Sequence, residues 1–97
     1  MRIRYHPAAL AELDAIFDYI TARNPAAAHR VIDTITRSIR RLERHPRSAR
    51  ESEIPGIRRL PIVQYPYIAF YTIDDDAQEV IILRVRHTSQ DPAHHLD

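Results

Sequence analysis

The hydrophobic pattern of this chain changes its period once, and the change divides the sequence into two structural halves. As far as His45-Pro46, apolar residues recur at the spacing of an amphipathic helix. After Pro55-Gly56, which contains the only glycine, they alternate with the period of a strand. A chain of 97 residues can form only one hydrophobic core. We therefore assign both halves to a single domain, residues 1–97. The pattern predicts an α+β fold.

The first half is expected to form a short strand and a helical hairpin. Residues 2–5 alternate between basic and apolar side chains, as a strand does. Pro7 then opens a helix whose apolar positions are Leu10, Leu13, Ile16, Phe17 and Ile20. Asn24-Pro25 provides a capping residue and a first-turn proline for a second helix, with an apolar stripe of Ala28, Val31, Ile32, Ile35, Ile39 and Leu42. So short a connection predicts two antiparallel helices.

The second half is expected to form three strands, over Ile57–Val63, Tyr67–Ile73 and Glu79–His87. Their short connections favour antiparallel hairpins, and Pro61 places the first strand at an edge or a bulge. The prediction is an antiparallel sheet of three to four strands, packed against the N-terminal α-helical hairpin in the order β-α-α-β-β-β. Residues 88–97 are expected to be a flexible polar tail.

All fourteen cationic residues are arginine, and ten of them lie in residues 1–50 beside five acids. Arginine suits phosphate or carboxylate recognition, although an arginine-rich codon usage gives the same composition. On the second helix Arg30, Arg37, Arg40, Arg41 and Arg44 fall within about 100° of each other, opposite the apolar stripe. This stripe is either an ordinary solvated face or a basic footprint for nucleic acid.

The last strand changes from apolar to basic along its length. Strict alternation places Ile81, Leu83, Val85 and His87 on one face, and Val80, Ile82, Arg84 and Arg86 on the other. If the helices cover the first face, Arg84 and Arg86 lie on the open side, where Arg58 or Arg59 can join them in an anion site. His87 is then the candidate acid or base. The alternative is that these arginines pair with Glu51, Glu53 or Glu79.

Other chemistry has less support in the sequence. His94 and His95, with Asp91 and Asp97, have metal-binding side chains but stand in a polar tail, so no metal site and no cofactor are expected. Asp74-Asp75-Asp76 is typical of a turn, and Tyr65, Tyr67 and Tyr71 favour packing over base stacking. The chain has no cysteine, no apolar signal core and no run long enough to span a membrane, so a cytoplasmic protein is expected.

Several short motifs occur in the order seen in one known family. They are the Pro7–Ile16 run, the Asn24-Pro25 break, Leu42-x-x-His45-Pro46, Gly56–Ile62, Tyr67–Tyr71 and Ile82–His87. Together they cover about nine tenths of the chain and resemble ParE-like toxins of the ParE/RelE toxin–antitoxin superfamily. Arg86 departs from the pattern, because an apolar residue is commoner there in ParE-like chains.

The resemblance implies a toxin that a cognate ParD-like antitoxin neutralises in a hetero-oligomer, with a disordered antitoxin segment folding along the helices and sheet. It further implies a non-enzymatic inhibitor of DNA gyrase. The target-binding residues that we predict from the strand pattern are Arg58, Arg59, Arg84 and Arg86, of which Arg84 matches the basic strand position of the family.

Two alternatives stay open at this point. One is a ribosome-dependent messenger RNA endoribonuclease like the RelE branch, for which the catalytic residues are Arg84, His87 and Arg59. The other is a non-toxic module that only binds an antitoxin.

Overall fold

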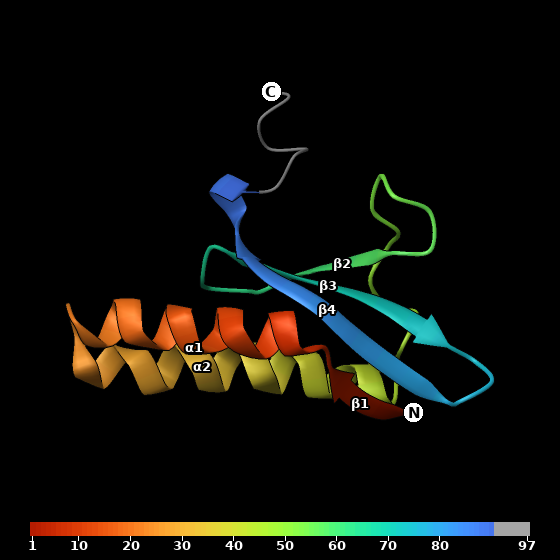
Figure 1. The fold of residues 1–97 in the computed structure, drawn as a ribbon, viewed down its shortest axis with the longest axis horizontal. Coiled ribbons are helices and arrows are strands. Elements are labelled where there is room, and N and C mark those ends of the chain that lie inside the picture. The colour runs from red at the N-terminus through yellow and green to blue at the C-terminus, as the bar shows by residue number, and fades with distance from the viewer. Residues whose placement is uncertain (91–97) are drawn as a thin grey trace.

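The computed structural model describes residues 1–90 as a helical hairpin packed on one face of a four-stranded sheet (Figure 1). The elements are β1 (Arg2–Tyr5), α1 (Pro7–Thr21), α2 (Pro25–Arg40), the 3-10 turn η1 (Arg41–Glu43), β2 (Arg58–Pro61), β3 (Tyr67–Asp74), β4 (Glu79–His87) and the 3-10 turn η2 (Thr88–Gln90). The predicted α+β class and the β-α-α-β-β-β order are confirmed. Of the predicted tail, residues 88–90 form η2, and the rest lies outside the described residues.

Side-chain caps fix where the two helices begin. The Nδ1 atom of His6 accepts a hydrogen bond from the Ala8 amide at 3.0 Å, and Pro7 takes the first turn. The Oδ1 atom of Asn24 accepts from the Ala27 amide at 3.2 Å, and Pro25 follows it. These caps satisfy backbone amides that lack partners at a helix start.

The strand order is β1-β4-β3-β2, which makes β2 an edge strand, as Pro61 predicts. The pairs β2–β3 and β3–β4 are antiparallel, as expected. β1, however, pairs with β4 in parallel, so the sheet is mixed rather than wholly antiparallel. Hydrophobic alternation fixes which face a strand buries but not the direction in which a distant strand joins the edge.

The predicted strict alternation along β4 is wrong at Leu83. Phe70 pairs with Arg84 while Tyr71 pairs with Ile82, so Leu83 is an extra residue that has no partner in β3. Such a bulge exchanges the faces of all residues beyond it. Val80, Ile82, Val85 and His87 therefore share the face that the helices cover.

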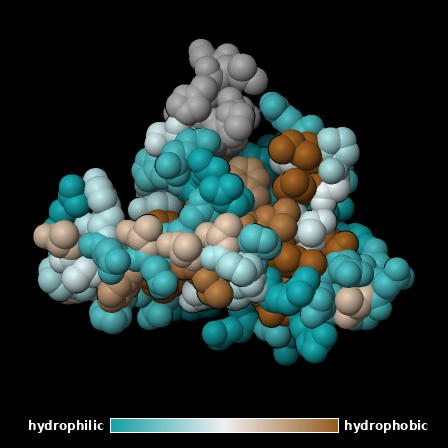
Figure 2. All heavy atoms as spheres, viewed as in Figure 1, coloured by the Kyte–Doolittle hydropathy of each residue, from teal (hydrophilic) through white to brown (hydrophobic). Residues whose placement is uncertain are grey.

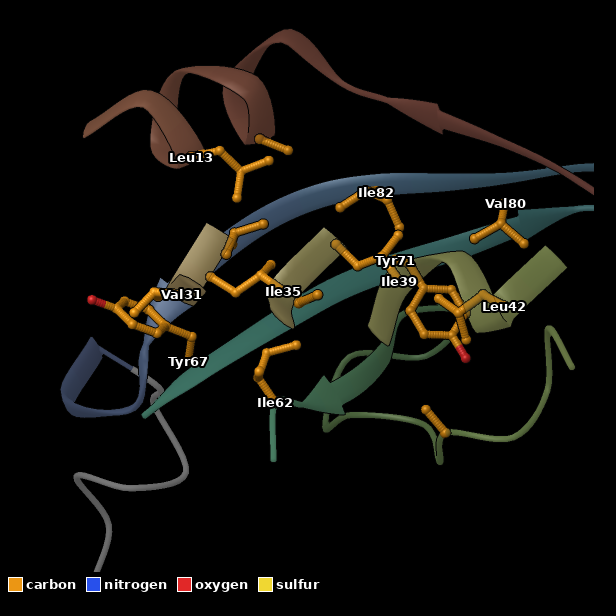
Figure 3. Close-up of a cluster of buried hydrophobic side chains, with 14 residues drawn as sticks. Leu13, Val31, Ile35, Ile39, Leu42, Ile62, Tyr67, Tyr71, Val80 and Ile82 are labelled. Atoms are coloured by element: carbon orange, nitrogen blue, oxygen red, sulfur yellow. The ribbon is translucent and has the colours of Figure 1, made fainter. Parts of the chain in front are cut away.

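The core fills the space between the helices and this face of the sheet, and hydrophobic residues are visible between the hairpin and the strands in the space-filling view of Figure 2. Figure 3 shows Leu13, Ile35 and Ile39 from the helices directed toward Tyr71 and Ile82 from the strands. The predicted α2 stripe is buried or half-buried throughout. In α1, Leu10 was expected in the stripe but is 49% exposed, and Ala9 is buried in its place.

Tyr71 connects the sheet to the loop that follows α2. Its ring is completely buried, and its hydroxyl donates a 2.7 Å hydrogen bond to the Pro46 carbonyl. The bond holds the chain where it leaves the helical hairpin for the sheet. A buried hydroxyl without this partner would be costly.

We expect Tyr71→Phe to lower the free energy of unfolding by about 1 kcal/mol, because it leaves the Pro46 carbonyl without this donor. The measurement is urea denaturation followed by circular dichroism. Tyr19→Phe is the matched control, since the Tyr19 side chain is 59% exposed and its loss of a hydroxyl should change little. Equal stability of the Tyr71→Phe variant and the wild type would contradict the role assigned to this bond.

Candidate functional site

Three of the four predicted target-binding arginines share the face of the sheet that lies away from the helices. The strand register places Arg59 beside Phe70 and Phe70 beside Arg84, and it places Ile68 beside Arg86. Directly paired residues point to the same side of a sheet. We name Arg59, Arg84 and Arg86 the sheet arginine face.

Arg58 is separate from these three residues. It pairs with Tyr71, so it starts from the face that the helices cover, and its Nη1 atom donates to the Ala49 carbonyl at 2.6 Å. A second contact, at 3.5 Å, reaches the Arg47 carbonyl. Arg58 therefore holds the loop before β2 rather than adding its charge to the sheet arginine face.

Glu12 of α1 binds the edge of β4 at the start of this face. Its carboxylate accepts from Nε and Nη2 of Arg84 at 3.0 and 2.9 Å and from the Val85 amide at 2.9 Å. The Nε atom of Arg86 lies 3.8 Å from the same carboxylate and makes no hydrogen bond within residues 1–90. The hydrogen bond and charge of Glu12 raise the pKa of Arg84. Glu12 thus fixes both arginines and satisfies the backbone where β1 ends.

This contact answers one alternative left open by the sequence. The strand arginines do pair with carboxylates, but the partner of Arg84 and Arg86 is Glu12 and not Glu51, Glu53 or Glu79. Glu79 instead pairs with Arg2 and Arg4 of β1. Sequence reasoning missed Glu12 because nothing in a helical pattern reveals a contact 72 residues away.

His87 lies on the opposite face of the sheet from Arg59 and Arg84. Its ring packs edge-on against Tyr67, with centroids 5.4 Å apart, and its Nδ1 atom accepts from the Ser89 amide at 3.1 Å. That bond places the proton of the neutral ring on Nε2. The strand register therefore places Arg59 and Arg84 on one face of the sheet and His87 on the other, while Glu12, the partner of Arg84, lines one pocket with His87 at the edge of β4.

A groove of about 530 Å³ runs between α1 and the end of β4. Its lining combines apolar and aromatic residues with polar ones: Ala15, Ile16, Tyr19, Tyr67 and Val85, with Glu12, His87, Ser89 and Gln90. Burial raises the pKa of the Tyr67 hydroxyl above its ordinary value. The groove offers apolar surface together with hydrogen-bonding groups, which suits a peptide.

Residues 1–90 contain no cluster of three His, Cys, Asp or Glu residues arranged to hold a metal ion. His94, His95, Asp91 and Asp97 lie outside the described residues. Asp74 and Asp75 have structural contacts: Asp74 accepts from the Ala77 amide within the turn, and Asp75 pairs with Arg47. None of the helices in the described part has the length and apolarity that a membrane crossing requires.

Residues 3–92 match the family described as the ParE toxin of the type II toxin–antitoxin system parDE. The chain belongs to the ParE toxin family. The Y4kP protein of Sinorhizobium fredii, itself only predicted to be a toxin, is 38% identical over 89 residues, which cover 92% of this chain and 90% of Y4kP. Type II toxin–antitoxin membership thus confirms the resemblance drawn from the motifs.

Solved structures agree with this assignment. The chromosomal ParDE toxin–antitoxin system of P. aeruginosa contains a chain that is 28% identical, with a TM-score of 0.81, covering 90% of this chain and 95% of that one. A chain of the intact RelBE complex of E. coli is 14% identical with a TM-score of 0.65, over 89% and 94% of the two chains, and shares the fold alone.

We expect Glu12→Ala to lower the free energy of unfolding by about 1–2 kcal/mol, because it leaves the Val85 amide and Arg84 without their acceptor at a partly exposed site. Glu12→Gln should cost less, since one amide oxygen can still accept from Val85. Asp14→Ala is the control, an exposed acid on the same helix. Urea midpoints of the three variants measure the effect, and a Glu12→Ala midpoint equal to that of Asp14→Ala would refute it.

Proposed function

We propose that this ParE-family toxin inhibits DNA gyrase without cutting nucleic acid, and that a ParD-like antitoxin neutralises it in a hetero-oligomeric complex. The observation that carries the first part is the separation of His87 from the arginines. Cleavage of a phosphodiester needs an acid or base within hydrogen-bonding reach of the atoms whose charge the cations stabilise. Here the strand register starts the His87 side chain from the other face of β4 than Arg84 and Arg86.

The sheet arginine face is the proposed target-binding surface. Arg84 is hydrogen-bonded to the Glu12 carboxylate and the Nε atom of Arg86 lies 3.8 Å from it, so both side chains lie at the edge of β4. This placement favours recognition of a shaped protein surface over contact with a mobile phosphate. Phe70 and Ile81 lie on the same face and are half-buried. A face that combines fixed cations with apolar side chains is typical of a protein interface.

The endoribonuclease alternative uses two of the same arginines. Its catalytic residues would be Arg84, His87 and Arg59, and a substrate would have to reach both faces of β4. The RelE chains of E. coli have the same fold as this chain, but their sequences are only 14% and 12% identical to it. The two functions differ in what happens to His87 variants.

We expect induction of the toxin without antitoxin to arrest growth, induce a DNA-damage reporter and leave messenger RNA intact. His87→Ala should remain toxic, because the proposed mechanism uses no proton transfer at that ring. Arg59→Ala should weaken toxicity, whereas Arg50→Ala, an exposed arginine outside the face, should not.

Fragmented messenger RNA that disappears with His87→Ala would replace gyrase inhibition with the endoribonuclease. Unimpaired growth on induction of the wild type, together with tight antitoxin binding, would instead support the non-toxic module.

The groove beside α1 is the proposed seat of the antitoxin. It joins apolar residues of α1 and β4, and Tyr19, one of the most exposed large apolar side chains, stands at its side. Solved complexes of this fold contain antitoxin chains, including the ParDE system of P. aeruginosa. A ParD-like segment would fit if it carried apolar side chains at the spacing of a helix or strand.

We expect Ala15→Arg to weaken the complex at least a hundredfold, because an arginine side chain would occupy the groove. Ala11→Arg, on an exposed position of the same helix outside the groove lining, is the matched control. Isothermal titration with the antitoxin measures both affinities. Unchanged binding of the Ala15→Arg variant would move the antitoxin to another surface.

A further inference from the structure

The arginines of α2, η1 and the residue after it differ from those of the sheet, because within residues 1–90 they have no side-chain partner. Arg2 and Arg4 pair with Glu79, and Arg84 and Arg86 with Glu12. Within residues 1–90, by contrast, no side-chain hydrogen bond or ion pair engages Arg30, Arg37, Arg40, Arg41 or Arg44, which we name the α2 arginine surface. All five are exposed. The charge of this surface is therefore not compensated from within the described fold.

These residues form a row along one side of the hairpin. Arg30, Arg37, Arg41 and Arg44 recur at seven-, four- and three-residue spacing on the side of α2 opposite its buried stripe. At 1.5 Å per residue the row is about 21 Å long. That length of duplex axis carries about a dozen phosphates, counted over both strands.

A hollow of about 430 Å³ lies at the C-terminal end of this row. Arg37, Arg40, Arg41 and Arg44 line it, together with His45 and the carboxylate of Glu43. The partial negative charge at the C-terminus of a helix attracts cations, which explains the arginines in the last turn of α2. It does not explain Arg30, which lies about three turns earlier. Asp33 stands among the arginines, so five cations face two carboxylates and the surface remains positive.

The composition of this surface favours a nucleic-acid backbone over a protein partner. Protein interfaces depend on apolar and aromatic anchors, and the exposed large hydrophobic residues of the described chain are Leu10, Tyr19, Ile54 and Val63, none of them on α2. Single strands are bound by stacking on aromatic side chains, and α2 and η1 contain no Phe, Tyr or Trp. Backbone contacts to a duplex need only cations on a rigid element.

We propose that the α2 arginine surface binds the phosphate backbone of duplex DNA without sequence preference. This activity goes beyond gyrase inhibition and does not depend on it, because the surface shares no residue with the sheet arginine face or the groove beside α1. It would hold the toxin close to DNA whichever protein the toxin attacks.

Fluorescence anisotropy of a labelled random-sequence 30-base-pair duplex tests the proposal, with the full chain purified free of other proteins. We expect the logarithm of the association constant to fall linearly with the logarithm of salt concentration, with a slope of about −3 to −4. The double variant Arg37→Gln, Arg41→Gln should lose about two units of slope and bind about tenfold more weakly at low salt. Asp33→Asn should bind more tightly than the wild type.

The matched control is the double variant Arg2→Gln, Arg50→Gln, which removes the same charge from exposed positions outside the surface. Near-wild-type binding by this control supports a localised site. An equal loss in both double variants, or no binding by the wild type, would overturn the proposal. Tighter binding of a single strand of the same length would also overturn the proposal. Competition by polyglutamate at equal charge would overturn it as well, and would identify an acidic protein as the partner.

Discussion

The contact between Glu12 and β4 is the interaction on which the arrangement of this toxin depends. β4 pairs with β3 along its whole length but with β1 only as far as Ile82. Beyond that point its outer edge has no strand, and α1 lies there instead. The Glu12 carboxylate accepts a hydrogen bond from the Val85 amide, as the carbonyl of a neighbouring strand would. It also accepts hydrogen bonds from Arg84 and forms an ion pair with Arg86. One side chain thus closes the edge, docks α1 and orients the arginines.

The bulge at Leu83 determines what chemistry the end of β4 can perform. If Leu83 were paired in regular alternation, it would share a face with Ile81 and His87, and Arg84 would lie with Ile82 in the core. With the bulge, Val80, Ile82 and Val85 all face the helices, while Arg84 and Arg86 face the other side. A strand that ends in cations can therefore complete the core and still present charge outward.

The sequence predicted those features that depend on local chemistry and periodicity. The proline and capping residues at Pro7, Asn24 and Pro25 fixed both helix starts, and the period-2 runs located β3 and β4 within one residue. It did not predict the parallel pairing of β1, the bulge, or the partner of Arg84. Each of these depends on residues far apart in the chain, and alternation alone carries no information about them. The exposure of Leu10 has the same origin, since the sheet decides which part of the α1 stripe is covered.

The arginines of the sheet and those of α2 have different roles in this molecule. On the sheet, guanidiniums are matched to carboxylates, so much of their charge is used to hold strands and α1 in place. On α2 the same residue type has no such match among residues 1–90, and its charge is available to a partner. The groove, the sheet arginine face and the α2 arginine surface are built from different residues on different elements. A segment seated against α1 would therefore leave the arginines of α2 uncovered, and neutralisation of the toxin and attraction to DNA are compatible in one complex.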